Sequence, residues 1–382
     1  MEPPSPEVID QAGLQRLIDV LWDGGWTVLG PTVRDSVIGN GEVRTLDDLP
    51  RGLGDTQDPA HYRLRDRGDE ALFGYVVGQQ SWKSVLFPAR ELLRRSTPGA
   101  REVDSPEPPP ARLALFGVRS CDLAAIGIHD RVLLERRAVD TRYAARRDAT
   151  FVVAVTCGTP GGTCFCTSMG TGPDPSQGFD LALTELLEDG DHRFLVRAGS
   201  QRGVDLLARI ASSPADRADV QAAAAVVDHA VAHMGRALDT DGIRDLLYAN
   251  AEHPQWDDVA RRCLSCTNCT LVCPTCFCTS VEDRTELATG TDERWRVWDS
   301  CFTSEYSYLH GGSVRPSVRS RYRQWATHKL ASWHDQFGSS GCVGCGRCVT
   351  WCPAAIDLTA EVAAIRASAS PPGAHPSSPP EA

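Results

Sequence analysis

The chain has 382 residues, fifteen cysteines and a formal net charge of −11 at pH 7. This acidic balance argues against a nucleic-acid backbone as the main partner, because such partners select an excess of basic residues. No apolar run approaches the ~20 residues that a bilayer-spanning helix needs. Because no charged-then-apolar leader opens the sequence, the cysteines predict a reducing cytoplasm, where thiolates bind metals rather than form disulfides.

Residues 1–95 are predicted to form an N-terminal α/β region. Apolar residues recur at helical spacing from Val8 to Trp22, and Gly24-Gly25 ends that helix. A second helix is predicted at Ala89–Arg95. Short β-like segments are predicted at Trp26–Leu29, Val33–Ile38 and Ala71–Val77. A proline-rich linker is then expected at residues 96–110.

Residues 111–252 are predicted to form a second α/β and helical region. Arg112–Val118 and Phe151–Val155 are apolar strands that flank a helix at Asp122–Glu135, which indicates a βαβ unit with a parallel pair. Cys121 and Cys157 follow the carboxyl ends of these strands, on the rim where open α/β sheets place their ligands. Further helical segments are predicted at Asp180–Glu188, Gly203–Ala211, Ala218–Met234 and Ile243–Ala251.

A glycine-rich loop at residues 161–172 carries Cys164 and Cys166. It has neither the phosphate-binding loop pattern nor the G-x-G-x-x-G of a dinucleotide site, so no nucleotide is predicted there. Its hexapeptide Thr163–Ser168 recurs as Thr275–Ser280. The repeat is either a shared turn or a pair of C-x-C loops that supply ligands to a cluster or shield it.

Two cysteine runs share the spacing C-x2-C-x2-C-x3-C-P, which is the ferredoxin signature. In that signature three thiolates hold three corners of a [4Fe–4S] cube, and the cysteine before proline ligates the other cluster. The first predicted set is therefore Cys263, Cys266, Cys269 and Cys352. The second is Cys342, Cys345, Cys348 and Cys273. Zinc remains an alternative, although zinc ribbons use C-x2-C pairs without the third cysteine or the C-P step.

The chain has two lysines, Lys83 and Lys329, and its other permanently basic residues are arginine. A lone lysine such as Lys83 is expected on the solvated surface. Between the two cysteine runs lie 68 residues that are rich in aromatic and arginine side chains. Such interleaving can bind single-stranded nucleic acid. Packing around the cubes, with the arginines facing carboxylates or an acidic partner, is the favoured interpretation.

The segments Gly117–Ala125 (GVRSCDLAA), Gly161–Cys166 (GGTCFC) and Asp299–Phe302 (DSCF), together with the paired runs, resemble the 4Fe-4S dicluster family. That family includes the beta subunit of sulfhydrogenase-type NiFe hydrogenases and one of the subunits of anaerobic sulfite reductase. The resemblance implies an α+β fold whose N-terminal α/β part precedes an α-helical ferredoxin-like module at residues 253–366. Residues 367–382 are expected to be a disordered tail.

The family implies an electron-transfer subunit of a cytoplasmic oxidoreductase complex with two [4Fe–4S] clusters. Its expected partners are a flavin- and NAD(P)-binding reductase and a catalytic hydrogenase or sulfite reductase subunit, with no membrane and no nucleic acid. No catalytic residue is predicted, because no acid/base or open metal arrangement is evident. The alternatives are a stand-alone enzyme acting at the Cys121/Cys157 rim and a structural zinc protein.

A third metal site is also predicted, because seven cysteines remain outside the two runs. The glycine-rich loop can curl over the strand rim and bring four thiols together. Its predicted ligands are Cys121, Cys157, Cys164 and Cys166. The competing ligand set is Cys276, Cys278 and Cys301. Buried, inert cysteines are the alternative interpretation.

Overall fold

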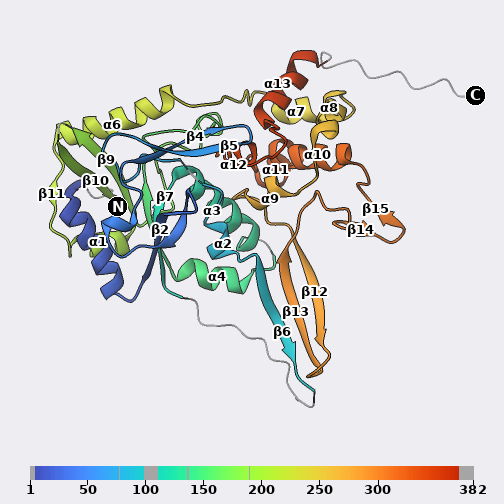
Figure 1. The fold of residues 1–382 in the computed structure, drawn as a ribbon, viewed down its shortest axis with the longest axis horizontal. Helices are drawn as coiled ribbons and strands as arrows, with labels where there is room; N and C mark the ends of the chain where they lie inside the picture. The colour runs from blue at the N-terminus through green and yellow to red at the C-terminus, as the bar shows by residue number, and fades with distance from the viewer. Residues whose placement is uncertain (1–4, 77, 99–110, 136, 189, 370–382) are drawn as a thin grey trace, which may run out of the picture.

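The computed structural model describes residues 5–369, apart from 77, 99–110, 136 and 189. Helices and sheets are mixed, as the predicted α+β class requires, with one large sheet in the N-terminal part and a cluster of short helices in the C-terminal part (Figure 1). The predicted linker at 96–110 and tail at 367–382 lie largely outside the described residues.

The large sheet has eight strands in the order β11-β1-β10-β9-β8-β7-β2-β3. Its four central strands β2, β7, β8 and β9 run parallel to one another, whereas the outer pairings are antiparallel. The strand bounds are β1 Glu7–Asp10, β2 Thr27–Arg34, β3 Val37–Glu42, β7 Leu113–Val118, β8 Thr150–Val155, β9 Leu181–Glu188, β10 Asp191–Ala198 and β11 Ser213–Pro214.

The predicted βαβ unit is confirmed by β7, α3 and β8. Strand β7 is almost wholly buried and β8 wholly so, as expected for parallel strands covered on both faces. Helix α3, Ser120–Leu133, begins directly after β7, so Cys121 lies at the carboxyl end of that strand. The other helices of this part are α1 Gln11–Asp23, α2 Lys83–Leu86, α4 Thr141–Asp148, α5 Gln201–Leu207 and α6 Arg217–Ala232.

Two predicted helices are wrong. The segment predicted as Ala89–Arg95 is strand β6, Arg90–Ser96, which pairs with β13, Thr291–Trp298. The segment predicted as Asp180–Glu188 is strand β9, held between β8 and β10. Leu, Glu, Arg and Ala are good helix formers, but helix propensity contributes little energy per residue. Strand pairing with other segments overrides it here. The segment predicted as a strand at Ala71–Val77 forms none in its described part, 71–76.

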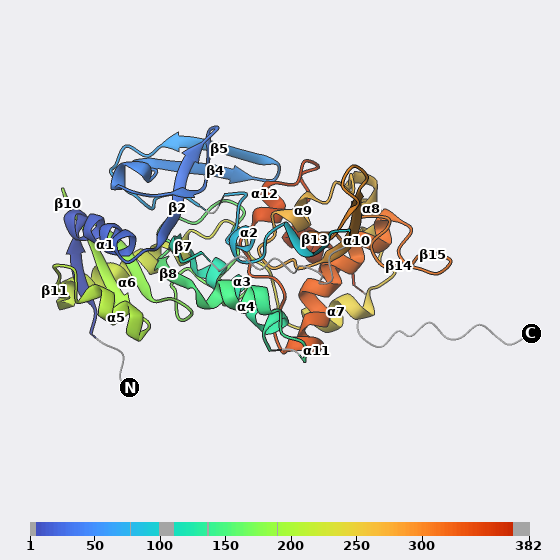
Figure 2. The same ribbon diagram turned by 90° about the horizontal axis from the view of Figure 1, so that it is seen from below.

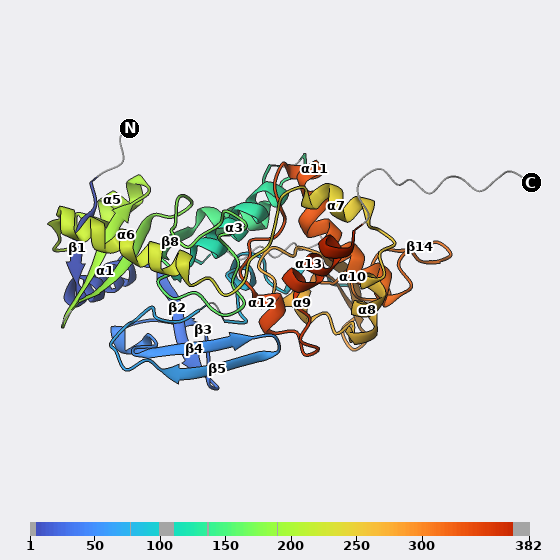
Figure 3. The same ribbon diagram turned by 90° about the horizontal axis from the view of Figure 1, so that it is seen from above.

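Smaller sheets surround these parts. Strands β12, Thr279–Glu286, and β13 form a hairpin that joins β6 in a narrow arm projecting from the molecule (Figure 1). The hairpin of β4, Leu53–Asp58, and β5, His61–Asp66, reaches from the N-terminal part toward α12, Arg347–Thr350 (Figures 2 and 3). The remaining short elements are η1 Leu46–Asp48, β14 Tyr308–Leu309 and β15 Gly312–Ser313.

The C-terminal helices pack around a core of aromatic and aliphatic side chains that includes Trp256, Phe302, Tyr322 and Trp325. Among the described residues, no helix has both the length and the apolar character that a bilayer crossing would need. The other helix bounds are α7 Ile243–Ala249, α8 Gln255–Arg262, α9 Asn268–Leu271, α10 Val318–Thr327, the π-helical turn η2 His328–Ser332, α11 Trp333–Phe337 and α13 Leu358–Ser368.

A buried ion pair joins the two parts. Arg347 on α12 donates to both carboxylate oxygens of Asp122 on α3, at 2.8 and 3.0 Å. The same guanidinium donates to the carbonyl oxygens of Gly78 (2.8 Å) and Gln80 (3.2 Å). Because Arg347 lies between Cys345 and Cys348, this contact fixes the second cysteine run against α3 and the segment that contains Gly78 and Gln80.

Candidate metal centres

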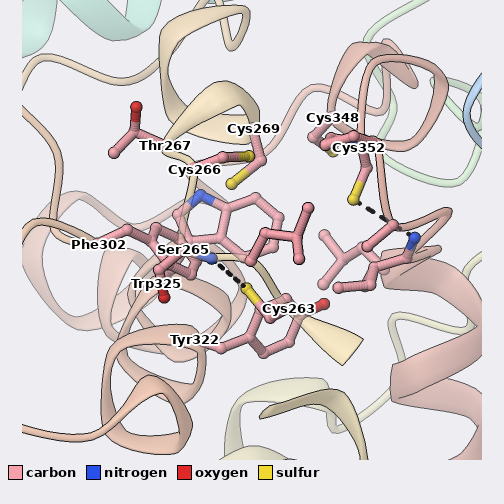
Figure 4. Close-up of a pocket in the computed structure, with 15 residues that line it drawn as sticks. Cys263, Ser265, Cys266, Thr267, Cys269, Phe302, Tyr322, Trp325, Cys348 and Cys352 are labelled. Carbon is pink, nitrogen blue, oxygen red and sulfur yellow. Dashed lines mark hydrogen bonds between the residues drawn. The ribbon is translucent and has the colours of Figure 1, made fainter. Parts of the chain in front are cut away.

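Three cysteines of the first run line one cavity together with Cys348 and Cys352 of the second run (Figure 4). Cys263 directly follows α8, Cys269 lies on α9, and Cys352 follows α12, so three separate elements position the thiols. The cavity is partly open to solvent. Figure 4 shows the sulfur atoms of Cys263, Cys266, Cys269 and Cys352 spread around it. We call this group of four cysteines the first site.

The wall of the first site is aromatic and carries free hydrogen-bond donors. Phe302, Tyr322 and Trp325 line the cavity, and its described lining includes no charged side chain. The Tyr322 hydroxyl and the Trp325 indole nitrogen are buried without a hydrogen-bond partner in the described structure. Buried donors of this kind need an acceptor. Thiolate sulfurs and orphaned donors around a largely apolar cavity suit an iron–sulfur cube, whose sulfurs accept hydrogen bonds.

Both cysteine runs adopt the same backbone turns. Residues at the third and fifth positions are left-handed in each run: Ser265 and Thr267 in the first (φ +50° and +68°), Gly344 and Gly346 in the second (φ +64° and +73°). A left-handed conformation is costly for residues other than glycine and persists where the surroundings enforce it. The two runs therefore present their thiols in equivalent ways.

Backbone amides of these turns donate to the cysteine sulfurs. Ser265 N lies 3.4 Å from Cys263 Sγ, and Gly344 N lies 3.5 Å from Cys342 Sγ, the equivalent contact in the second run. Ile356 N lies 3.5 Å from Cys352 Sγ. Amide hydrogen bonds of this kind stabilise the thiolate form that binds iron.

The second site, Cys342, Cys345, Cys348 and Cys273, lies deeper. Cys273 and Cys345 are buried, whereas Cys266 of the first site is exposed. Burial and the thiolates of Cys342, Cys273 and Cys345 raise the pKa of Cys348 well above its usual value. Burial likewise raises the pKa of Cys342 to about 12, even though the charge of Lys329 opposes it. These mutual effects place the four thiols close together.

Cys273 has the opposite shift. Its hydrogen bond with the Cys276 thiol outweighs burial and, with the charge of Lys329, holds the pKa of Cys273 well below its usual range. Lys329 Nζ donates to Cys273 Sγ at 3.1 Å and to Thr275 Oγ1 at 3.0 Å. This thiol is therefore stabilised as a thiolate, the form in which cysteine ligates a metal.

The loop with Cys164 and Cys166 packs directly on the second run. Phe165 N donates to Gly344 O at 2.8 Å. A Cβ at Gly344 would lie 2.6 Å from the carbonyl of Phe165, so only glycine permits this approach. The loop thus covers the second site.

Three of the four cysteines predicted for the third site lie in one buried cluster, of which Cys157 is not a member. Burial raises the pKa of Cys166 to about 12, with the thiolates of Cys157 and Cys345 adding to it. Burial also raises the pKa of Cys121, and the charges of Asp122, Cys345 and Cys166 add to that shift. Cys121, Cys164 and Cys166 share one buried cluster with Cys345 of the second site.

The competing set is divided between two neighbourhoods. The Cys276 thiol is hydrogen-bonded to Cys273. The charge of Cys278 instead raises the pKa of Cys301, which burial, the larger cause, brings to about 12. Across the described ranges, no three Cys, His, Asp or Glu side chains are arranged to hold a single metal ion.

Lys329 was not predicted to belong to a site, and the expectation for Lys83 is wrong. Both side chains are 5% exposed rather than solvated. Lys83 Nζ donates to the carbonyl oxygens of Thr270 and Leu271, on the helix that leads to Cys273. These contacts compensate the ammonium for its lost water. The sequence signal that could have pointed to these two residues is that lysine is scarce in a chain with many arginines.

Comparison with known proteins agrees with the geometry. A family described as "4Fe-4S dicluster domain" matches residues 262–356, which contain both cysteine runs. The chain is 35% identical to "Sulfhydrogenase 2 subunit beta" of Pyrococcus furiosus over 249 residues, or 64% of this chain and 72% of that protein. No solved structure matches the chain significantly.

Proposed function

Because the chain belongs to the family of the sulfhydrogenase beta subunits and is an iron–sulfur electron-transfer subunit, we propose that it relays electrons between a flavin- and NAD(P)-binding reductase and a catalytic subunit. The catalytic partner is of the hydrogenase or sulfite reductase type. The observation that carries this proposal is that Cys352, from the second run, lines the same cavity as Cys263, Cys266 and Cys269; Cys348 of the second run borders that cavity too.

Two [4Fe–4S] cubes are the proposed cofactors, one at each site. The first would be held by Cys263, Cys266, Cys269 and Cys352, and the second by Cys342, Cys345, Cys348 and Cys273. The cubes supply one-electron transfer with little rearrangement. The described lining of the first site offers aromatic and aliphatic side chains and no acid or base, which suits transfer of electrons rather than of protons or groups.

The two sites differ in their access. Cys266 and Leu264 are exposed at the first site, and Leu264 keeps 67% of its surface. The second site is covered by the loop around Phe165. The first site is therefore the proposed point of exchange with a partner that binds over Leu264.

The arginines of the 68-residue segment support protein rather than nucleic-acid contacts. Several pair with carboxylates of this chain, as the sequence predicts. The pairs are Arg294 with Asp283, Arg296 with Glu91 and Asp140, Arg319 with Glu252 and Asp257, and Arg323 with Glu252. Cytoplasmic location, independence from a membrane and the absence of nucleic-acid partners remain parts of the proposal.

A test of the relay is reduction by NADPH under anaerobic conditions. Alone, the chain should show no bleaching of its cluster absorbance, because no dinucleotide fingerprint is evident in its sequence. Adding the co-purified flavin-bearing subunit should bleach it, and adding the catalytic subunit should restore the colour on turnover. Direct reduction of the chain alone, with flavin retained on it, would contradict the proposal.

We propose a third [4Fe–4S] cube at Cys121, Cys157, Cys164 and Cys166. Two cubes correspond to about eight irons per chain and three to about twelve. Wild-type protein should therefore contain about twelve irons, and a Cys164→Ser/Cys166→Ser variant about eight, counted by metal and sulfide analysis. A matched Cys278→Ser variant, which leaves Cys276 beside Cys273, should keep the wild-type content. Equal iron in the Cys164/Cys166 variant and wild type, with the variant folded, would eliminate this site. Zinc in place of iron and sulfide would overturn all three cubes.

A further inference from the structure

The chain's two lysines are both buried, and both lie beside the second site. Of 39 Lys and Arg residues, only Lys83 and Lys329 are lysine. They come from elements far apart in the sequence, α2 and the π-helical turn η2. In the described structure, neither ammonium forms an ion pair with a carboxylate, so their positive charges are uncompensated by acidic side chains.

Lys329 contacts a proposed ligand directly. Its Nζ donates to Cys273 Sγ at 3.1 Å and to Thr275 Oγ1 at 3.0 Å. Its carbonyl oxygen accepts from Gly341 N at 2.7 Å and from Ser340 Oγ at 3.0 Å, at the start of the second run. Lys329 therefore touches the second site at two of its ligand segments. It lies on a π-helical turn, a geometry that is common at functional sites.

Lys83 contacts the backbone that precedes Cys273 rather than a cysteine sulfur. Its Nζ lies 3.3 Å from Leu271 O and 3.5 Å from Thr270 O, on the last turn of α9 before Cys273. The ammonium also lies 3.9 Å from the centre of the Trp298 ring. It thus adds positive charge near Cys273 without touching a cysteine sulfur.

In the described structure, no lysine lines the first site, although Lys83 contacts the backbone of α9, which carries Cys269. The described lining of the first site is formed by cysteine, small polar, aliphatic and aromatic residues, without a lysine, arginine or histidine. The hydrogen-bond donors there are neutral groups, namely backbone amides, the Tyr322 hydroxyl and the Trp325 indole. The two sites therefore differ in formal charge although their cysteine runs have the same turns.

We propose that Lys329, supported by Lys83, raises the reduction potential of the second cube. The lysines would thereby set the potential of that cube separately from that of the first; this inference rests on the function proposed above. Reduction adds one negative charge to a cube, and no bond forms or breaks. A buried cation that donates an N–H···S bond stabilises the reduced state more than the oxidised one. Lysine suits this position because its compact ammonium can donate to Cys273 and Thr275 at once.

The test is an EPR-monitored redox titration of full-length, anaerobically purified protein with dithionite. The second cube's signal is identified as the one that a Cys342→Ser variant loses. In Lys329→Met its midpoint potential should fall, while the first cube's midpoint stays constant. Lys329→Arg should retain most of the wild-type potential, because it keeps the charge. Lys83→Met should give a smaller fall. The exposed Arg244→Met should move neither midpoint.

An unchanged second midpoint in a folded, fully loaded Lys329→Met protein would refute the inference, as would an equal shift in both cubes. If Lys329→Met fails to hold the second cube, Lys83→Met and Lys83→Arg decide. A lower midpoint potential of the second cube in Lys83→Met, but not in Lys83→Arg, supports the inference. An unchanged midpoint in Lys83→Met refutes it. Wild-type protein without two cubes would instead refute the proposed function, so the two failures are distinguishable.

Discussion

Replacing Cys273 by serine should remove or alter the same EPR signal as replacing Cys342, although the two residues belong to different cysteine runs. Cys273 lies beside Lys329 and acts electrostatically on Cys342, Cys345 and Cys348. Its loss should cost the second cube, or about four irons per chain. Redox-resolved EPR, with iron analysis of each variant, measures this.

The matched controls belong to the first site. Cys352→Ser, at the end of the second run, should change the same signal as Cys269→Ser, because both side chains line the first cavity. If Cys273→Ser instead changes the signal that Cys269→Ser changes, each run holds its own cube and the crossed assignment is wrong.

The second large effect is expected at Arg347. Its side chain is 2% exposed and makes a bidentate bond to Asp122, whose side chain is 5% exposed. Arg347→Met would leave that carboxylate buried without its partner, which costs roughly 3–5 kcal/mol of folding free energy. Urea denaturation under anaerobic conditions, followed by fluorescence and cluster absorbance, should show unfolding at markedly lower urea.

Two variants separate the buried pair from a general charge effect. Arg244→Met removes an exposed arginine that pairs with Asp335, and should change the urea midpoint little. The double variant Arg347→Met/Asp122→Leu should recover part of the lost stability, because replacing both partners by apolar groups leaves no unpaired charge. A single Arg347→Met variant as stable as wild type would show that the pair does not join the two parts.

Local patterns in the sequence account for much of what was predicted correctly. The buried strands at Arg112–Val118 and Phe151–Val155 flank a helix within one short segment, so the parallel βαβ unit could be inferred. The resemblance to the 4Fe-4S dicluster family is confirmed by the match to residues 262–356 and by the sulfhydrogenase relative. Both rest on spacing between nearby residues.

What was missed depends on contacts between distant segments. Arg90–Ser96 is a strand because it pairs with β13, a segment far along the chain. Asp122 and Arg347 are separated by 225 positions, and no spacing rule relates them. Lys329 approaches Cys273 from a π-helical turn that the sequence gives no sign of. Single-sequence patterns do not register such pairings.

The glycine contacts between the Phe165 loop and the second run bear on how the protein is assembled in the cell. Gly344 and Gly346 pack against the backbone of residues 163–166, so the loop and the second run would have to separate for a preformed cube to enter from that side. We therefore expect the proposed cube of the second site to be inserted before the loop and the second run close on one another. The first site, open beside Cys266, can be loaded afterwards. The expected order of assembly is the buried cube first and the exposed cube last.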